Sequence, residues 1–275
     1  MPENAGDSGA RPIAGSAFSS TLVRGGIRFA ILLLLLYTAA FSLLYIEQRQ
    51  LLYFPAATRV AVGDTHFALR NEGVVLRGWI ENPGQQRALL YFGGNGESLG
   101  SERAEFAAMF PHRTVYLLAY RGYGASDGEP AEQSLFSDAL TLFDRVRARH
   151  VAVAVVGRSL GSGVASYLAS KRPVERLALV TPFDSIVNVA YAHYPYFPVP
   201  WLLKDRYEST RYIPRYHGPI LVLCAGRDDV VPPADTDRLL AEISASHAVL
   251  AFPSAGHNSI SDDPGYAPTL SEFMK

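Results

Sequence analysis

Short apolar runs alternate with segments of helical periodicity along most of this 275-residue chain. Six runs have the continuous Val, Leu, Ile and Phe content of strands that are buried on both faces. They are Ala88–Phe92, Val115–Tyr120, Ala152–Val156, Leu177–Thr181, Ile220–Ala225 and Val249–Phe252. Between two of these runs, Leu135, Ala139 and Leu142 fall on one face of a predicted helix. Strands and helices in alternation predict an α/β fold, with a mostly parallel central sheet and helices on both faces.

Two segments depart from this alternation. Phe67–Asn71 and Val74–Glu81 flank Glu72-Gly73 and predict an N-terminal antiparallel β-hairpin. The segment from about Pro182 to Gly218 is rich in aromatic residues and prolines. We expect this segment to form a small cap over a substrate pocket. A surface loop packed by its own aromatic residues is the alternative.

The N-terminus differs in composition from the remainder. Residues 1–23 are rich in Gly, Ser, Ala and Pro, and we predict that they form a disordered tail. The 18 residues from Phe29 to Ile46 carry no charge and are long enough to cross a bilayer as one helix. We therefore predict a transmembrane anchor over residues 24–47 and one folded domain over residues 48–275.

A cleaved signal peptide is the alternative to an anchor. Its apolar core is usually about 7–15 residues long and is followed by a small-residue cleavage site. Here the run is longer and ends in Tyr45-Ile46-Glu47-Gln48. Arginine is more frequent before the span (Arg11, Arg24, Arg28) than after it (Arg49, Arg59). This bias predicts a cytoplasmic N-terminus and a folded domain on the exported side.

The charge and cysteine content narrow the classes of function. Lys and Arg number 25 against 26 Asp and Glu, a net charge of -1, and no basic run occurs, so we expect no nucleic-acid binding. The single cysteine, Cys224, excludes an internal disulfide and lies in a predicted strand as a small core residue. Since the sequence has neither a Cys/His cluster with metal-ligand spacing nor a phosphate-binding loop motif, we expect no metal or organic cofactor.

The segment Gly157-Arg158-Ser159-Leu160-Gly161 has the pattern GxSxG. It lies between a predicted strand, Val151–Val156, and a predicted helix, Gly161–Arg172. A tight strand-to-helix turn of this kind exposes a serine hydroxyl above the end of the sheet. Glycines suit the turn because side chains at those positions would clash. The helix N-terminus also favours a developing anion, so we predict that Ser159 is a nucleophile.

A nucleophilic serine needs a base to take its proton and a carboxylate to orient that base. On such a sheet the order along the chain is Ser, Asp or Glu, then His, each just after a strand. His257 follows the last apolar run and is the predicted general base. Asp228 and Asp229 both follow the run Ile220–Ala225, and only one can point at His257. Counting back from Val230 favours Asp228, which we predict as the acid, whereas counting forward from Gly226 favours Asp229.

The oxyanion of such a reaction needs two backbone N–H groups aimed at it. The N–H of Leu160, one residue past the nucleophile, is the first. The second should come from the glycine-rich loop Gly93-Gly94-Asn95-Gly96, which follows the run Ala88–Phe92. We predict that Asn95 supplies it. An ordinary glycine turn is the alternative.

Further motifs occur in the same order along the chain. They are QLLYFP at 50–55, FGGNGE at 92–97, YRGYG at 120–124, GRSLGSG at 157–163, TPFDS at 181–185, LLKDRY at 202–207, GRDDVVP at 226–232 and GHN at 256–258. With these motifs the chain resembles the α/β-hydrolases, and within them the N-terminally membrane-anchored branch of membrane lysophospholipases and protein depalmitoylases. The resemblance covers roughly residues 48–275. It is more specific for the fold and the triad than for the substrate.

The oxyanion loop departs from the family pattern at one position. The family usually has His-Gly-Asn there, whereas this chain has Gly93-Gly94-Asn95. A side chain that could brace the loop is therefore missing, and the loop is either looser or braced by another group.

The resemblance and the ordered residues Ser159, Asp228 and His257 predict a serine hydrolase. It would cleave ester or thioester bonds of acyl substrates through an acyl-enzyme intermediate, and an adjacent membrane anchor suggests lipid or lipidated substrates. A peptidase or amidase with the same residues is one alternative. A non-catalytic, membrane-anchored binding module is the other, and the altered oxyanion loop favours it.

Overall fold

The computed structural model describes residues 15–275, with side chains from Val23 onward. The chain divides into two compact units, Met1–Glu47 and Gln48–Lys275. The disordered tail predicted from the sequence covers residues 1–23. Residues 1–14 lie outside the described part, and helix α1 (Gly15–Leu52) begins within the remainder.

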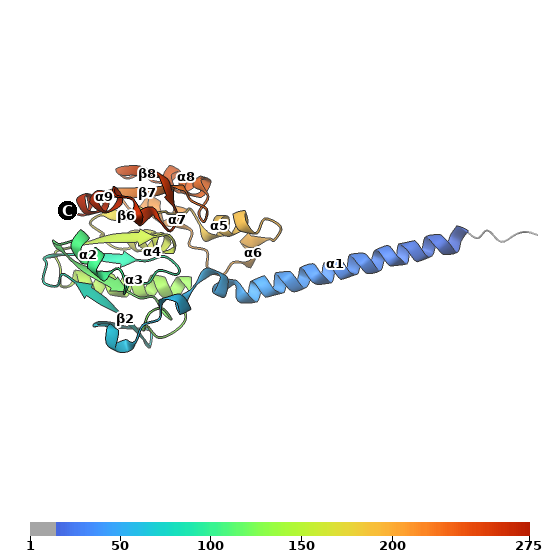
Figure 1. The fold of residues 1–275 in the computed structure, drawn as a ribbon, viewed down its shortest axis with the longest axis horizontal. Coiled ribbons are helices and arrows are strands. Elements are labelled where there is room, and N and C mark those ends of the chain that lie inside the picture. The colour runs from blue at the N-terminus through green and yellow to red at the C-terminus, as the bar shows by residue number, and fades with distance from the viewer. Residues whose placement is uncertain (1–14) are drawn as a thin grey trace, which may run out of the picture. The chain divides into compact units, whose positions relative to one another are not determined.

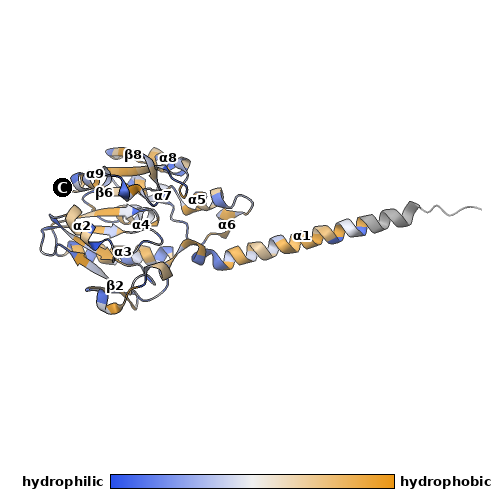
Figure 2. Cartoon of the chain, in the orientation of Figure 1, coloured by the Kyte–Doolittle hydropathy of each residue, from blue (hydrophilic) through white to orange (hydrophobic). Residues whose placement is uncertain are grey.

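Helix α1 is coloured as apolar along most of its described length (Figure 2). Within the described part of the chain, it is the one helix long and apolar enough to cross a membrane. Leu34, Leu35 and Leu36 are 64%, 61% and 59% exposed, and three consecutive helical residues point in different directions. A helix that is apolar on every side suits a lipid environment better than water.

The second unit is built on an eight-stranded sheet with the order β1-β2-β4-β3-β5-β6-β7-β8 (Figure 1). The predicted hairpin forms its antiparallel end, since β1 pairs with β2 and β2 pairs with β4 in antiparallel fashion. The remaining pairs are parallel. The strands are β1 Phe67–Asn71, β2 Val74–Glu81, β3 Arg87–Phe92, β4 Arg113–Leu118, β5 Ala152–Arg158, β6 Leu177–Val180, β7 Ile220–Arg227 and β8 His247–Gly256.

Helices cover both faces of this sheet, as the strand-helix alternation predicts. They are α2 Arg103–Met109, α3 Glu132–Arg147, α4 Leu160–Ala169, α5 Ile186–His193, α6 Val199–Leu202, α7 Ser209–Tyr212, α8 Pro233–Ala241 and α9 Tyr266–Phe273. Short 3-10 turns span Pro55–Thr58, Val62–Asp64, Ile213–Arg215 and Ile260–Asp262. Successive strand residues belong to separate cores. Leu90 belongs to the core that includes residues of α3, α4 and α8, whereas Leu89 belongs to the core that includes residues of α2 and α9. The predicted α/β class and sheet are confirmed.

The last strand differs from the prediction that every run is buried on both faces. Val249 and Leu250 of β8 are 47% and 39% exposed. The reason is topological, because β8 ends the sheet and, among the strands that the structure describes, pairs with β7 alone. A run of apolar residues does not by itself distinguish an edge strand from a central one.

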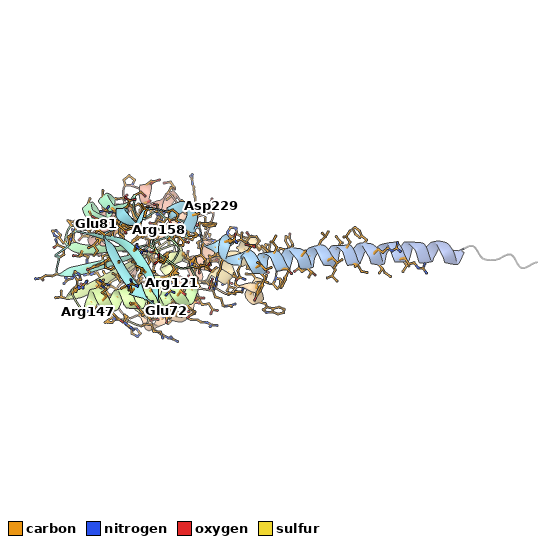
Figure 3. The ribbon with its side chains drawn as sticks, turned by 90° about the horizontal axis from the view of Figure 1, so that it is seen from below. Glu72, Glu81, Arg121, Arg147, Arg158 and Asp229 are labelled. Carbon is orange, nitrogen blue, oxygen red and sulfur yellow. The ribbon has the colours of Figure 1, made fainter. Side chains whose placement is uncertain are left out.

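A buried ion pair fixes the loop after β4 to helix α3. Arg121 Nε donates to Asp138 Oδ2 at 2.8 Å, and both side chains are less than 10% exposed. Arg121 also pairs with Glu72 in the turn between β1 and β2, and Figure 3 labels both residues. Asn71 donates from its side chain to Asp138 Oδ1 at 2.7 Å. These three contacts form one polar network that joins the hairpin, the loop and the helix.

The predicted cap insertion contains α5, α6, α7 and the turn Ile213–Arg215, all between β6 and β7. Its start is fixed by the buried Asp184, which accepts hydrogen bonds from the Ser185 N–H and the Asn188 side chain at 2.6 and 2.5 Å. Arg238 of α8 also donates to Asp184. The insertion is therefore attached to the same helix that follows the loop of Asp228.

Candidate active site

Ser159 lies between the end of β5 at Arg158 and the start of α4 at Leu160. Its backbone has φ 49°, a region that side-chain-bearing residues rarely adopt. Ser162 holds the turn, because its N–H and Oγ donate to the Ser159 carbonyl at 2.9 and 2.6 Å. The local sequence thus produces the strained strand-to-helix turn that the GxSxG pattern predicts.

The two flanking glycines are required by close backbone approach. A Cβ at Gly157 would lie 2.4 Å from the Gly161 carbonyl oxygen and 2.6 Å from the Ala165 Cβ. A Cβ at Gly161 would lie 1.9 Å from the Phe92 carbonyl oxygen at the end of β3. None of these three distances is compatible with a side chain. The glycines therefore allow α4 to pack directly against the sheet beneath Ser159.

The structure brings Ser159, His257 and Asp228 together at the carboxyl ends of β5, β8 and β7. His257 Nε2 lies 2.8 Å from Ser159 Oγ. His257 Nδ1 lies 2.8 Å from Asp228 Oδ2 and 3.0 Å from Oδ1. The side chains of His257 and Asp228 are only 5% and 7% exposed. A buried imidazole held between a hydroxyl and a carboxylate can accept the hydroxyl proton and keep the resulting cation paired.

Of the two adjacent aspartates, Asp228 is the one within hydrogen-bonding distance of His257. The Asp228 Oδ1 atom also accepts the N–H groups of Val230 and Val231 at 2.9 and 2.7 Å. These two bonds fix the carboxylate in the turn and direct it at the imidazole. Asp229, labelled in Figure 3, is exposed to solvent.

The glycine-rich loop after β3 approaches the serine. A Cβ added at Gly94 would lie 3.7 Å from the Ser159 Cβ, so the loop passes close to Ser159 at this residue. The Gly94 N–H donates to Glu97 Oε2 at 2.7 Å. Among the described hydrogen bonds of Asn95, the carbonyl and the side-chain amide are engaged, whereas the backbone N–H is not. Leu160, whose N–H is the other predicted donor, is buried at the start of α4.

Gly93 stands where the family usually has histidine, and the side chains of Leu99 and Glu97 occupy the space that the histidine would fill. A Cβ at Gly93 would lie 3.1 Å from Leu99 Cδ2 and 3.2 Å from Glu97 Oε2. Glu97 therefore fills the space behind the loop and binds it through the Gly94 N–H. Tyr91 OH donates to the other oxygen of Glu97 at 2.5 Å. The missing side chain at position 93 is thus matched by an acidic one four residues later.

A second brace comes from the segment that enters the folded domain. Asn95 Nδ2 donates to the Leu52 carbonyl at 3.0 Å, and the Phe54 N–H donates to the Asn95 carbonyl at 2.9 Å. Tyr123 OH donates to the same Asn95 carbonyl at 2.7 Å. Leu52, Phe54 and Tyr123 therefore hold Asn95 through three hydrogen bonds. The residues of this brace lie in the motifs QLLYFP and YRGYG. The sequence shows the motifs, but their contacts with Asn95 are visible only in the structure.

Arg158 joins the serine turn to its neighbours. Its Nη1 lies 3.7 Å from Glu97 Oε1, and its Nη2 donates to the Asn258 carbonyl at 3.0 Å. Burial alone would lower the Arg158 pKa, but the combined influence of Glu97, Tyr91, Tyr266 and Glu102 outweighs burial, and the pKa is raised. Burial, followed by the Glu97 charge, raises the pKa of Glu102 to about 8. One guanidinium thus links the loops that carry Asn95, Ser159 and His257.

Cys224 lies in β7 and is partly buried. Burial raises the pKa of its thiol to about 11, so the thiol stays protonated near neutral pH. The residue matches the small core side chain that the sequence predicts.

Comparison with known proteins adds three findings. An uncharacterised protein of Mycobacterium tuberculosis is 34% identical over 240 residues, which cover 82% of this chain and 85% of that protein. A lysophosphatidylserine lipase of Danio rerio is 28% identical over 233 residues, covering 72% of this chain and 61% of the lipase. The crystal structure of an α/β-hydrolase from Vibrio vulnificus superposes with a TM-score of 0.62 at 20% identity, over 74% of this chain and 79% of that one. No family model matches the chain.

Proposed function

We propose that this chain, which has the α/β-hydrolase fold and a lysophosphatidylserine lipase among its relatives, is a serine hydrolase that cleaves ester or thioester bonds of acyl substrates. The observation that carries the proposal is the continuous hydrogen-bonded series from Ser159 through His257 to Asp228. Its geometry has the order and spacing of a nucleophile, a base and an orienting carboxylate.

In the first half-reaction, Ser159 Oγ attacks the acyl carbonyl while His257 Nε2 takes the hydroxyl proton. Asp228 stabilises the imidazolium and keeps Nδ1 protonated. The tetrahedral oxyanion accepts hydrogen bonds from the N–H groups of Leu160 and Asn95. His257 then donates its proton to the leaving alcohol or thiol, and the acyl group stays on Ser159.

In the second half-reaction, water replaces the leaving group. His257 removes a proton from this water, which attacks the acyl-enzyme carbonyl, and the same N–H groups hold the second oxyanion. His257 returns the proton to Ser159 Oγ, and the free carboxylic acid departs. Every proton transfer uses the single imidazole nitrogen that faces Ser159.

We propose further that α1 anchors the enzyme in a membrane and that its substrates are lipids or lipidated molecules. The exposed apolar side chains of α1 support the anchor. The Danio rerio relative is a lysophosphatidylserine lipase, which supports an acyl lipid as the substrate class. The Arg bias around the span favours a cytoplasmic N-terminus, with the hydrolase domain on the exported side.

The test is hydrolysis of p-nitrophenyl esters of increasing acyl length by the wild type and by Ser159→Ala. We expect Ser159→Ala to reduce kcat on the order of 10⁶-fold, as loss of a triad serine does in a serine protease. The acyl length with the highest kcat/KM reports the depth of the pocket. Turnover by folded Ser159→Ala at the wild-type rate would contradict the nucleophile, and preference for aminoacyl amides over esters would indicate an amidase.

A further inference from the structure

The cap insertion carries large aromatic side chains that face solvent in the second unit. Trp201 is 88% exposed and Tyr196 is 86% exposed, while Tyr191 and Tyr194 are 52% and 41% exposed. All four lie within eleven consecutive residues, between the start of α5 and the end of α6. Trp and Tyr carry an apolar ring with a polar group, and such side chains are enriched at the headgroup level of membranes.

The segment that carries Trp201 is bound to the residues at which the chain enters the second unit. Gln48 Nε2 donates to the Leu202 carbonyl at 3.2 Å, and Gln48 Oε1 accepts the Lys204 N–H at 2.8 Å. Arg49 Nε donates to the buried carboxylate of Asp205 at 2.9 Å. The end of α6 therefore cannot move away from Gln48 and Arg49 without breaking these bonds.

Chain length places Gln48 near the end of the uncharged stretch. This stretch ends at Ile46, so only Glu47 separates it from Gln48. Two residue steps span at most about 7 Å even when fully extended. The headgroup layer on each side of a bilayer is about 5–8 Å thick. If α1 spans a bilayer, Gln48 and the bonded Leu202 must therefore lie at or next to the headgroup layer.

The polar neighbours of the aromatic side chains suit a lipid surface rather than an apolar protein groove. Lys204 is exposed directly after the α6 segment, and the Arg49 side chain is 47% exposed. Lys or Arg beside Tyr and Trp is the usual composition of a membrane-interface segment, where the cations pair with lipid phosphates.

We propose that Tyr191, Tyr194, Tyr196 and Trp201 form a membrane-docking surface that inserts into the headgroup layer of the bilayer in which α1 is anchored. The surface fixes the cap against the membrane, so that the hydrolase domain has a second attachment besides the chain itself. This inference rests on the proposed anchor, and it adds a specific depth for the cap. It does not depend on the identity of the acyl substrate.

The chain contains a suitable reporter, because its two tryptophans have opposite environments. Trp201 is 88% exposed, whereas Trp79 is 2% exposed and donates from its indole to the Asp64 carbonyl. In Trp79→Phe the fluorescence comes from Trp201 alone, and in the matched control Trp201→Phe it comes from Trp79 alone. Both full-length proteins are reconstituted into phosphatidylcholine–phosphatidylserine vesicles, and circular dichroism checks their folding.

The measurement is quenching by lipids brominated near the headgroup end of the acyl chains. We expect at least a twofold loss of Trp201 fluorescence with brominated lipid and little loss of Trp79 fluorescence. Unquenched Trp201 would overturn the proposal. Aqueous iodide then reports what replaces the lipid: quenching by iodide means that Trp201 stays in water, and protection from iodide means that a protein surface or a second copy covers it. If Trp79→Phe does not fold, the difference between wild type and Trp201→Phe gives the same comparison.

Two further readouts separate this proposal from those on which it rests. Alkaline carbonate extraction of the same vesicles tests the anchor, because a spanning helix stays in the pellet. Labelling by a fluorophosphonate probe tests Ser159. A protein that stays in the pellet and reacts with the probe, but shows no lipid quenching of Trp201, would contradict the docking surface alone.

Discussion

Asp228 and Asp229 are neighbours in the chain, yet their side chains meet different surroundings. Asp228 is held by two backbone N–H groups and faces His257, whereas Asp229 is exposed. We expect Asp228→Asn to lower kcat by about 10⁴-fold, because an amide favours the wrong imidazole tautomer. The matched control Asp229→Asn should change kcat by no more than about twofold, as surface substitutions do. Steady-state kinetics on one soluble ester compares them, and equal losses in the two variants would contradict the assignment.

The Tyr123 hydroxyl donates to the Asn95 carbonyl in the predicted oxyanion loop and accepts the Phe54 N–H. Tyr123→Phe removes both bonds while the ring stays in place. We expect kcat to fall by about tenfold with little change in KM, since a misplaced donor weakens transition-state binding more than substrate binding.

The matched control for Tyr123 is Tyr116→Phe, which removes another buried hydroxyl. Tyr116 OH lies 3.0 Å from His150 Nε2, away from Ser159 in the sequence and in the sheet. In urea unfolding, Tyr116→Phe should lose about 1 kcal/mol of stability and Tyr123→Phe about 1–2 kcal/mol, since each hydrogen bond is worth about 1 kcal/mol. If Tyr116→Phe lowers kcat as much as Tyr123→Phe, the loss is a general effect of stability and the brace is not specific.

Among the elements, α4 approaches β3 more closely than any side chain would allow. The Cβ of Gly161→Ala would lie 1.9 Å from the Phe92 carbonyl oxygen, so α4 would have to move away from the sheet. We expect a loss of more than about 4 kcal/mol in the free energy of unfolding, or no soluble protein. Gly63→Ala is the control, because a Cβ at Gly63 meets no atom within 4 Å. Thermal unfolding of the two variants is the measurement.

The loop before α2 contributes a pH dependence. Burial and the Glu97 charge raise the pKa of Glu102 to about 8 from an ordinary value of 4.5. Between these two pH values the folded protein binds more protons at this site than the unfolded chain does, so stability falls as pH rises. Glu102→Gln should remove this fall. Urea midpoints at pH 5 and pH 9 test it, and a wild-type midpoint that rises with pH relative to Glu102→Gln would contradict the direction.

At the same scale, local sequence patterns predicted the strands well. All six apolar runs became strands in the predicted mostly parallel sheet, and the hairpin lies at its antiparallel end. The exposure of β8 was not predictable from its residues. Val249 and Leu250 are as apolar as the residues of a central strand, and their exposure follows only from their place at the edge.

For the whole molecule, sequence reasoning was limited by contacts between distant segments. The strand-end rule gave candidates for the nucleophile, acid and base because each follows its own strand. The bracing of Asn95 joins residues 43 and 28 positions apart, and the Arg49–Asp205 pair joins residues 156 apart. No periodicity in the chain reports such pairs. Glu97 illustrates the limit, since its role depends on the space that a glycine at position 93 leaves open.

The division of α1 between the two units decides where the chain could be cut to obtain a water-soluble enzyme. The last turn of the helix, from Gln48 to Leu52, bonds to Leu202, Asp205 and Asn95. A polypeptide that starts at Gln48 would omit the uncharged apolar segment from Phe29 to Ile46 and still keep these bonds. A version that starts at Phe54 would begin just after the helix ends. It would, however, lack Arg49, which pairs with Asp205, and Leu52, whose carbonyl accepts from Asn95. Crystallisation trials and inhibitor screens should therefore begin from the longer version.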